Sequence, residues 1–323
     1  MRNRILCYAV MVSVSLFPLF PQATMAAEKY PAHEIQLVIP NPAGGFIDIA
    51  VRMMSDNLSK ILGVPIIINN RTGAGGASGT TFLAKAKPDG YTMGAAPSAD
   101  VVLIPATLPS VPYKPTDLDP LCKFILSPSA VYCKADAPWK TIEDLVADAK
   151  KRPGKLTYGA TTQSISYFQM EGFMAAAGFN MLHIPLQGVG QTTTRILGGN
   201  LDIGISSVAP LVGQFKAGTI RPLMLISPER MPEFSQIPTM KEKGFENPLD
   251  LYAGFFLPLG TPKPIKDVLE KALEKAIKDP SLKSKLEGVF LELDYVPAAA
   301  FSKEIQDDYK KVTNFLKAAA AKK

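Results

Sequence analysis

The sequence predicts an α/β protein built from two lobes with a ligand cleft between them. Strand-like and helix-like segments alternate from residue 35 onward, which is typical of βαβ units around a mainly parallel sheet. A proline-rich stretch, Pro105 to Pro120, separates two such blocks. The chain of 323 residues suits two domains of ordinary size behind an N-terminal export signal.

Residues 1–27 have the pattern of a secretory signal peptide. Arg2 and Arg4 precede an apolar run from Ile5 to Phe20, and small residues follow it. The run contains a proline and is shorter than the ~20 apolar residues that a membrane-spanning helix needs. We therefore predict a cleaved signal and an exported, periplasmic protein.

The first block should contain three strands and two helices, which alternate. In chain order these are strand Ile35–Ile39, helix Ile47–Leu62, strand Val64–Ile68, helix Gly79–Ala86 and strand Tyr91–Ala95. Helical spacing of apolar residues identifies the first helix, and β-branched residues identify the second strand.

The second block begins with two apolar stretches, Leu121–Leu126 and Ala130–Cys133, that could be neighbouring strands. A helix should follow over Thr141–Lys151, because Thr141 with Asp144 three residues later forms a capping-type start. Four short strands and three helices complete the prediction: strands Leu156–Tyr158, Met181–Ile184, Asp202–Ile205 and Pro222–Ile226, and helices Tyr167–Ala177, Pro262–Lys278 and Phe301–Lys317.

Cysteine and charge content restrict the possible functions. Export to an oxidising compartment permits a disulfide between Cys122 and Cys133, and two buried, unreactive thiols are the alternative. These two cysteines and two histidines are poor material for a metal site, so we expect neither metal nor cofactor. The formal net charge is +6, but the sequence shows no basic face interleaved with aromatic residues. This argues against a nucleic-acid partner.

The turn from Asn41 to Asp48 is the first candidate ligand site. Ligands of open α/β sheets bind beyond the carboxyl ends of strands, where helices begin. Gly45 and Phe46 stand where the first long helix should start, so unpaired N–H groups and the positive helix end could hold a carboxylate. Asp48 could contact the ligand, but capping and pairing with Arg52 one turn later is the favoured interpretation.

Three further turns are rich in Gly, Ser and Thr. The turn from Asn70 to Gly79 matches neither a dinucleotide fingerprint nor a P-loop nor a nucleophile elbow, so its glycines should permit close packing or line the cleft. The other two turns and the ends of two strands supply neutral polar groups that could orient a ligand. These additional candidates are Ser98, Thr161, Thr162, Ser164, Gln187, Gly188 and Ser206.

A catalytic function is not expected. A nucleophile needs a base within reach, and His183 reads as a hydrogen-bonded structural histidine within a short strand. The Gly/Ser-rich turns contain no pair of carboxylates. We therefore predict a binding protein and keep an exported hydrolase only as a rival hypothesis.

Many short stretches match one family in order and over almost the full length. They include Val38-Ile39-Pro40 with Gly44-Gly45 and Asp48, Asn70-Arg71 with Gly73-Ala74-Gly75-Gly76, Lys87-Pro88-Asp89-Gly90-Tyr91-Thr92, Pro153-Gly154-Lys155-Leu156-Thr157-Tyr158, His183-Ile184-Pro185 with Gly188, and Gly260-Thr261-Pro262. The sequence resembles the extracytoplasmic solute receptors of tripartite tricarboxylate transporters, also called Bug receptors.

The resemblance implies a type II periplasmic-binding-protein fold whose two lobes close on a small organic carboxylate. It implies a monomer that hands this ligand to membrane permease subunits of a tripartite tricarboxylate transporter. Lobe 1 should comprise residues 28–127 and 252–323, and lobe 2 residues 128–251. A receptor that presents its ligand to a membrane sensor kinase is the alternative, because the same fold serves both roles.

The second lobe departs from the family pattern. Thr162, Ser164 and Ile165 replace a Gly, a Gly and a Ser, and Phe168 stands where a histidine is usual. Leu186-Gln187 replaces Tyr-Lys, and Ser206-Ser207 replaces an aspartate or asparagine. The ligand-facing wall should therefore be less charged, which suits an aromatic or weakly polar carboxylate.

Overall fold

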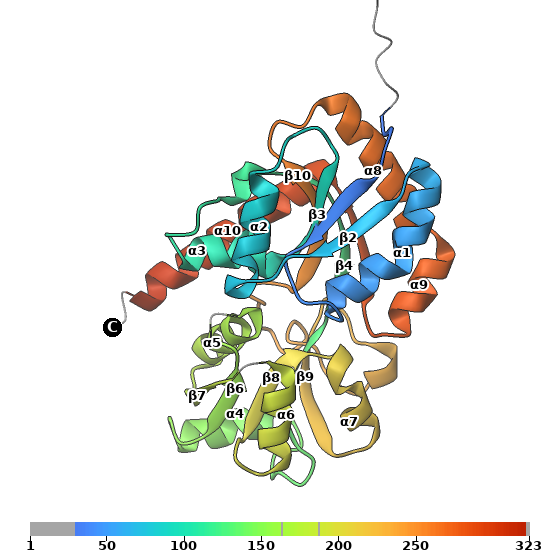
Figure 1. The fold of residues 1–323 in the computed structure, drawn as a ribbon. Helices are drawn as coiled ribbons and strands as arrows, with labels where there is room; N and C mark the ends of the chain where they lie inside the picture. Colours follow the sequence, from blue (N-terminus) through green and yellow to red (C-terminus); the bar gives the residue numbers. More distant parts are fainter. Residues whose placement is uncertain (1–29, 163, 187, 321–323) are drawn as a thin grey trace, which may run out of the picture.

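The computed structural model describes residues 30–162, 164–186 and 188–320, and it forms two lobes, each built around one β-sheet (Figure 1). The predicted signal peptide lies outside the described residues. None of the helices in the described part combines the length and the apolar character that a membrane span requires. Across the same residues, no group of three or more His, Cys, Asp or Glu side chains is placed to hold a metal ion.

The sheet of the first lobe has six strands in the order β11-β4-β10-β3-β1-β2. Their bounds are β1 Ile35–Ile39, β2 Ile66–Asn70, β3 Thr92–Pro97, β4 Leu118–Leu126, β10 Tyr252–Pro258 and β11 Glu292–Pro297. β1 runs parallel to β2 and β3, whereas β10 lies antiparallel between β3 and β4. The chain therefore returns from the second lobe to complete the centre of this sheet.

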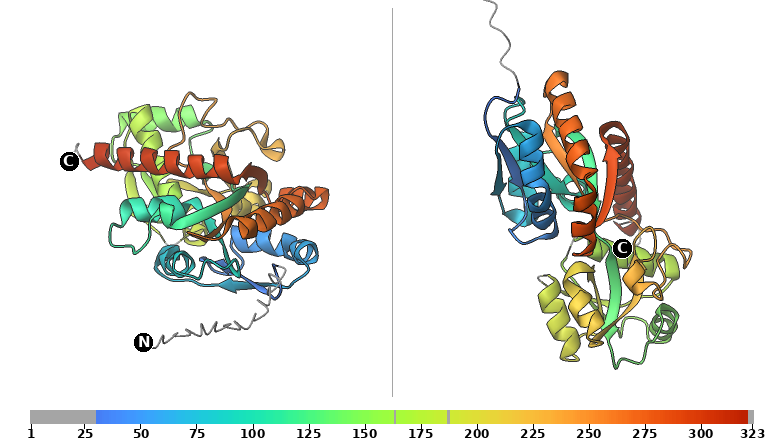
Figure 2. Two further views of the ribbon diagram at one scale, coloured as in Figure 1. Left: turned by 90° about the horizontal axis from the view of Figure 1, so that it is seen from above. Right: turned by 90° about the vertical axis from the view of Figure 1, so that its right-hand side faces the viewer.

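Helices cover both faces of this sheet (Figure 1). One face carries α1 (Phe46–Leu62), α8 (Lys263–Ile277) and α9 (Pro280–Glu287). The other carries α2 (Ala77–Ala84), α3 (Ile104–Thr107), α10 (Ala298–Ala320) and the π-helical segment η2 (Ala99–Leu103), while short 3-10 turns lie at η1 (Ala74–Gly76) and η3 (Pro115–Asp117). Figure 2 shows α10 as a long helix whose C-terminal end projects past the rest of this lobe.

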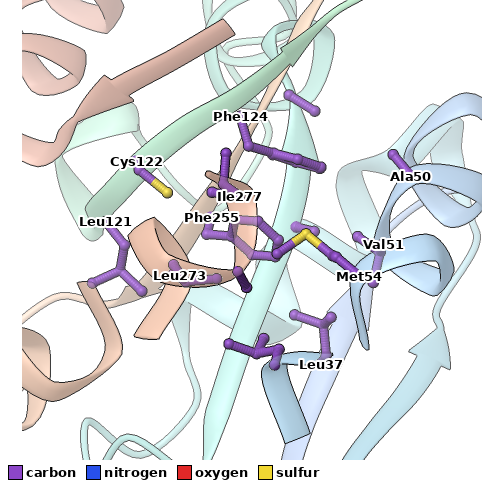
Figure 3. Packing of buried hydrophobic residues seen from close by; sticks show 14 of the residues in the cluster. Leu37, Ala50, Val51, Met54, Leu121, Cys122, Phe124, Phe255, Leu273 and Ile277 are labelled. Carbon is purple, nitrogen blue, oxygen red and sulfur yellow. The ribbon is translucent and has the colours of Figure 1, made fainter. Parts of the chain in front are cut away.

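The main core of the first lobe lies between the sheet and the layer of α1 and α8. Met54 of α1 and Phe255 of β10 meet there, with Leu273 of α8 beside them (Figure 3). All three side chains are buried. At ~1.5–3 kcal/mol for each fully buried large apolar side chain, this layer anchors α1 firmly and so fixes the loop at its N-terminus.

The sheet of the second lobe has five strands in the order β7-β6-β8-β5-β9. Its strands are β5 Ser129–Lys134, β6 Thr157–Ala160, β7 Leu182–Pro185, β8 Ile203–Ser207 and β9 Ile220–Ile226. Its helices are α4 Ile142–Lys151, α5 Ile165–Ala177, α6 Val189–Leu197 and α7 Val212–Lys216, with 3-10 turns at η4 Ala209–Leu211 and η5 Pro232–Phe234. β6 is parallel to β7 and β8, so their carboxyl ends share one edge.

Two chain segments connect the lobes, one after β4 and one before β10. They lie side by side, because Ser127 N donates a hydrogen bond of 2.7 Å to Leu251 O. Because the two segments meet there, we propose lobe boundaries between residues 127 and 128 and between residues 251 and 252.

The disulfide that the sequence permitted between Cys122 and Cys133 is not formed. Cys122 and Cys133 are both free thiols, and both are buried. They follow one another closely in sequence, but β4 belongs to the first sheet and β5 to the second. Each thiol packs in the core of its own lobe, which agrees with the alternative prediction of two buried thiols. Burial raises the pKa of Cys133 to about 11, which suits an unreactive thiol.

Candidate functional site

The loop Pro40–Gly45 joins β1 to α1 and lies on the side of the first lobe that faces the second (Figure 1). Gly45 is the N-cap of α1 and offers no side chain to cap it. The first N–H groups of this 17-residue helix therefore lack a side-chain cap, and they carry the positive end of its dipole. This geometry favours an anion, as the sequence predicted for Gly45 and Phe46.

Asp48 holds this loop together from below. It is buried, and its carboxylate accepts hydrogen bonds from Gly44 N (2.9 Å), Arg52 Nε (2.9 Å) and Asn70 Nδ2 (3.1 Å). Asn70 Nδ2 also donates to the main-chain oxygen of Asn41 (3.1 Å). The predicted pairing of Asp48 with Arg52 is confirmed, and the carboxylate has a structural role in the loop.

The hydrogen bonds to Asp48 decide its charge. Burial alone would raise the pKa of Asp48, but the bonds from Arg52, Gly44 and Asn70 outweigh burial and lower it. Asp48 is therefore ionised at neutral pH. Arg52, Gly44 and Asn70 already satisfy its carboxylate, so Asp48 is not available as a charged group for a ligand.

We expect Asp48→Asn to reduce the free energy of unfolding by about 2 kcal/mol at pH 7, because hydrogen bonds to a charged acceptor are lost. The pKa of Asp48 is lowered on folding, so its stabilisation is present above the unfolded pKa of about 4 and is lost as pH falls further. Urea denaturation at pH 7 and pH 3 should show the difference between the proteins shrinking at acid pH. Asp56→Asn, on the exposed face of α1, is the control and should leave the free energy of unfolding unchanged at both pH values. A difference for Asp48→Asn that does not depend on pH would contradict this role.

The glycine-rich turn after β2 serves close packing. A Cβ on Gly79 would lie 2.4 Å from Arg71 O and 2.7 Å from the Cα of Pro40. The start of α2 therefore lies directly against the chain leaving β1. This confirms close packing, one of the two predicted roles of these glycines, for Gly79.

Ser98 lies at the end of β3 and is fully buried. Its hydroxyl donates to Asp250 O (2.7 Å) and accepts from Tyr252 N (3.3 Å). Ser98 thus fastens the first lobe to the segment that returns from the second. These bonds give the hydroxyl a structural role at the junction of the lobes.

The hydroxyl-rich loop after β6 and the loop after β7 are joined to each other. Gly188 N donates a hydrogen bond of 3.1 Å to Thr161 Oγ1. Thr161 and Thr162 are exposed, whereas Ser164 caps α5 by accepting from Tyr167 N (3.2 Å). Gln187, another predicted ligand residue, lies outside the described residues.

Gly188 is the N-cap of α6, and like Gly45 it has no side chain to cap its helix. Its φ of 94° lies in the region that only glycine adopts without strain. The first N–H groups of α6 therefore repeat in the second lobe the arrangement at the start of α1. Ser206 lies deeper, with its hydroxyl 3.4 Å from the Tyr132 hydroxyl, and it is buried.

The family resemblance placed Phe168 in the ligand-facing wall, but the structure does not. Its side chain is buried and packs against Phe315 of α10, with ring centroids 5.9 Å apart. It joins an apolar cluster with Val101 and Leu103 of η2, so it connects the two lobes. His183 is a hydrogen-bonded histidine as predicted, with Nε2 3.0 Å from Ala160 O.

Few charges are available in the candidate site. In the loop stretches 40–48, 161–164 and 187–190, Asp48 is the one ionisable side chain of the sequence, and it is paired with Arg52. Main-chain N–H groups and helix ends must therefore supply most of the attraction for an anion.

Sequence reasoning missed Asp100, which lies in η2 behind the loop of Asn41. It is fully buried, and neither of its carboxyl oxygens has a hydrogen-bond partner within the described residues. The sequence does contain one indication of its burial, because Asp100 stands directly before the apolar run Val101–Ile104. A charged residue type beside such a run is rarely buried without a specific reason.

Comparison with known proteins places this architecture in one family. The family model of the tripartite tricarboxylate transporter family receptor, TctC, matches residues 50–320. A UPF0065 protein encoded in the gbd 5′ region of Cupriavidus necator is 31% identical over 291 residues, covering 90% of this chain and 88% of that protein. Protein BugT of Bordetella pertussis is 30% identical, covering 79% of this chain and 80% of BugT.

Solved structures agree with the fold. A TctC solute binding protein from Polaromonas superposes with a TM-score of 0.77 at 27% identity, covering 90% of this chain and 99% of that one. MatC of Rhodopseudomonas palustris, solved with malate, has a TM-score of 0.74 at 22% identity, with coverage of 88% and 99%. A second R. palustris protein, solved with adipate, has a TM-score of 0.76 at 24% identity, with coverage of 88% and 97%. The predicted two-lobed periplasmic-binding-protein fold is confirmed, and the chain belongs to the TctC family of tripartite tricarboxylate transporter receptors.

Proposed function

We propose that this protein is a periplasmic receptor that captures a small organic carboxylate between its lobes and delivers it to the permease subunits of a tripartite tricarboxylate transporter. The observation that carries the proposal is a pair of glycine N-caps. Gly45 and Gly188 begin α1 and α6 on loops at the carboxyl ends of β1 and β7, one loop in each lobe.

Two such helix ends can share one anion. Each presents N–H groups and a partial positive charge, and each such charge–dipole contact stabilises an anion by ~0.3–1 kcal/mol at an exposed site and by up to ~2 kcal/mol when partly buried. Bringing both ends onto one carboxylate requires the lobes to approach, so binding favours the closed arrangement. The ligand thereby selects its own enclosed state.

The residues proposed to face the ligand come from three loops. They are Asn41, Gly45, Phe46, Thr161, Thr162, Ser164, Gln187 and Gly188. Asp48 holds the first loop in place through Gly44 and Asn70, whereas Ser98 and Ser206 are buried and bond to Asp250 O and to the Tyr132 hydroxyl. The exposed threonine hydroxyls can both donate and accept, which suits the polar or neutral end of the ligand.

The relatives support this class of ligand. MatC was solved with malate and another member of the fold with adipate, both small organic carboxylates. The second-lobe loops of the present chain contain hydroxyl and amide groups in place of ionisable ones. We therefore propose one principal carboxylate in the ligand, with a weakly polar or aromatic remainder.

A thermal-shift panel tests ligand capture. Malate, adipate and benzoate are assayed beside their neutral methyl esters. We expect one or more acids to raise the midpoint temperature by roughly 5–10 °C at 100 times Kd, because such binding adds ~2.7 kcal/mol to the stability. The matching ester should give no shift. A wide organic-acid panel with no response, repeated by calorimetry, would argue strongly against the proposal.

Delivery needs a separate experiment. Vesicles that contain the permease subunits should accumulate the labelled acid only when the receptor is added, and in proportion to its ligand occupancy. Uptake that is equal with and without the receptor would leave capture intact but would contradict the transport role.

A further inference from the structure

Asp100 is an unusual group at the edge of the candidate site. It lies in the π-helical segment Ala99–Leu103, and its exposed fraction is 0%. Its main-chain oxygen accepts a hydrogen bond of 2.6 Å from the Tyr113 hydroxyl. The carboxyl oxygens have no hydrogen-bond partner, and the described residues provide no ion pair to Asp100. π-helical segments are often found at functional positions.

The residues that the structure ties to the Asp100 carboxyl, Gly76, Asn41 and Tyr113, are neutral. Gly76 of η1 lies so close that a Cβ there would come within 2.2 Å of Asp100 Oδ2. Asn41 of the ligand loop lies near enough to influence the carboxyl, and its own Oδ1 is buried without a partner. Thr80 of α2 has a buried, unpartnered hydroxyl beside Tyr113, whose pKa burial raises.

These surroundings disfavour a charged carboxylate. Burial raises the pKa of Asp100 well above its usual range, and the nearby Asn41 amide offsets this only in part. A carboxylate without a cation or donors takes up a proton in such a place. The protonated acid has one O–H donor, and Asn41 Oδ1 is a buried acceptor that lacks a donor.

We propose that Asp100 is a protonated positioning residue for the ligand loop: its carboxyl O–H donates a hydrogen bond to Asn41 Oδ1. This bond pairs two of the polar atoms that otherwise remain without a partner in the interior, one Asp100 carboxyl oxygen and Asn41 Oδ1. A second contact fixes the same loop, because Asn70 Nδ2 donates to the main-chain oxygen of Asn41 and to Asp48 Oδ1.

The pair has a consequence for ligand binding, and this part rests on the proposed function. Loss of the proton would break the hydrogen bond from Asp100 to Asn41 and would place a negative charge beside the loop that receives a carboxylate. Affinity for the acid should therefore fall as pH rises through the titration of Asp100. Asp48, which is ionised and fully paired, exerts no such effect over the same range.

Asp100→Asn tests the inference, because the asparagine amide reproduces the donor and acceptor of the neutral acid without a proton to lose. The native pKa is raised, so the native protein binds one proton more than the unfolded chain above about pH 4. The folding constant of the wild type should then fall tenfold per pH unit relative to that of Asp100→Asn, until the native group ionises. Urea denaturation at pH 5, 6 and 7 measures the ratio.

The remaining variants exclude trivial explanations. Asp56→Asn removes an exposed carboxylate and should leave the ratio to wild type independent of pH. Asp100→Ala should lose stability at every pH and should not be rescued at low pH, since it has no donor for Asn41. A wild-type to Asp100→Asn ratio that is constant with pH would overturn the inference, as would equal stability of the Ala and Asn variants.

Ligand affinity supplies the second measurement. For an acid found in the thermal-shift panel, wild-type affinity should fall with pH while the affinity of Asp100→Asn stays level; parallel profiles would overturn the positioning role. The denaturation experiment needs no ligand. A panel without any binder together with a pH-dependent ratio would therefore refute the proposed function alone, and binding with a constant ratio would refute the role of Asp100 alone.

Discussion

Gly45→Val is expected to lower carboxylate affinity at least ~100-fold. The valine side chain would stand at the N-cap of α1, over the N–H groups that are proposed to receive the ligand. Charge-assisted hydrogen bonds contribute about 1.5–3 kcal/mol each, so losing two of them accounts for such a reduction. Isothermal titration of wild type and variant with the same acid measures the change.

The variant should remain folded. Gly45 has φ −71° and ψ 165°, an extended conformation that valine adopts readily, and its added Cβ would meet only Pro42 O at 3.2 Å. Gly198→Val is a matched control, since its Cβ would also meet its nearest atom, Asn200 Nδ2, at 3.2 Å. Gly198 follows the last residue of α6, at the end opposite to Gly188. Unchanged affinity in Gly45→Val, or equal loss in Gly198→Val, would contradict the assignment of the loop.

Local sequence signals predicted the elements whose residues carry their own evidence. The strand Ile35–Ile39 has the predicted bounds, and Thr141 caps α4 with Asp144 reciprocating as the sequence indicated. Such patterns depend on neighbours in the chain, which a sequence displays directly. The predicted β2 began two residues early because Val64 and Pro65 extend the apolar run beyond the paired strand.

Elements that depend on distant partners were missed. β10 is buried along its whole length and shows no alternation, and its partners β3 and β4 precede it by more than a hundred residues. β11, α6, α7 and α9 were also not predicted. The suggested pairing of the two cysteine strands failed for the same reason, since sheet membership is decided by the fold and not by separation in sequence.

The candidate site divides in the same way. The glycine loops could be found because their composition is unusual and they follow strands. The roles of Asp48, Ser98 and Phe168 depend on which side chains meet them, and only Asp48 had a partner at helical spacing. Asp100 is defined by what is absent around its carboxyl, and a sequence cannot show that.

Gly254→Val should strongly destabilise the fold, with a loss of more than ~3 kcal/mol in the free energy of unfolding. Gly254 lies in the centre of β10, and a Cβ there would come within 2.2 Å of Phe301 Cε1 and 2.8 Å of Cys122 O. Phe301 is fully buried and can move little. Overpacking of this kind typically costs ~1–3 kcal/mol, and a main-chain contact that cannot relax raises the cost. Urea denaturation measures it, with Gly213→Val on α7, where a Cβ meets nothing within 4 Å, as the control.

A double variant separates the two contacts. Phe301→Ala alone should cost about 3–5 kcal/mol, because it leaves a cavity against Tyr252 and Phe256. In Gly254→Ala/Phe301→Ala the missing ring makes room for the new methyl group, so the combined loss should be smaller than the sum of the two single losses. The Cys122 carbonyl still opposes the methyl group, so the double variant should stay less stable than Phe301→Ala. Strictly additive losses would show that the ring does not confine Gly254. In that case the need for glycine in β10 would come from the neighbouring strand alone.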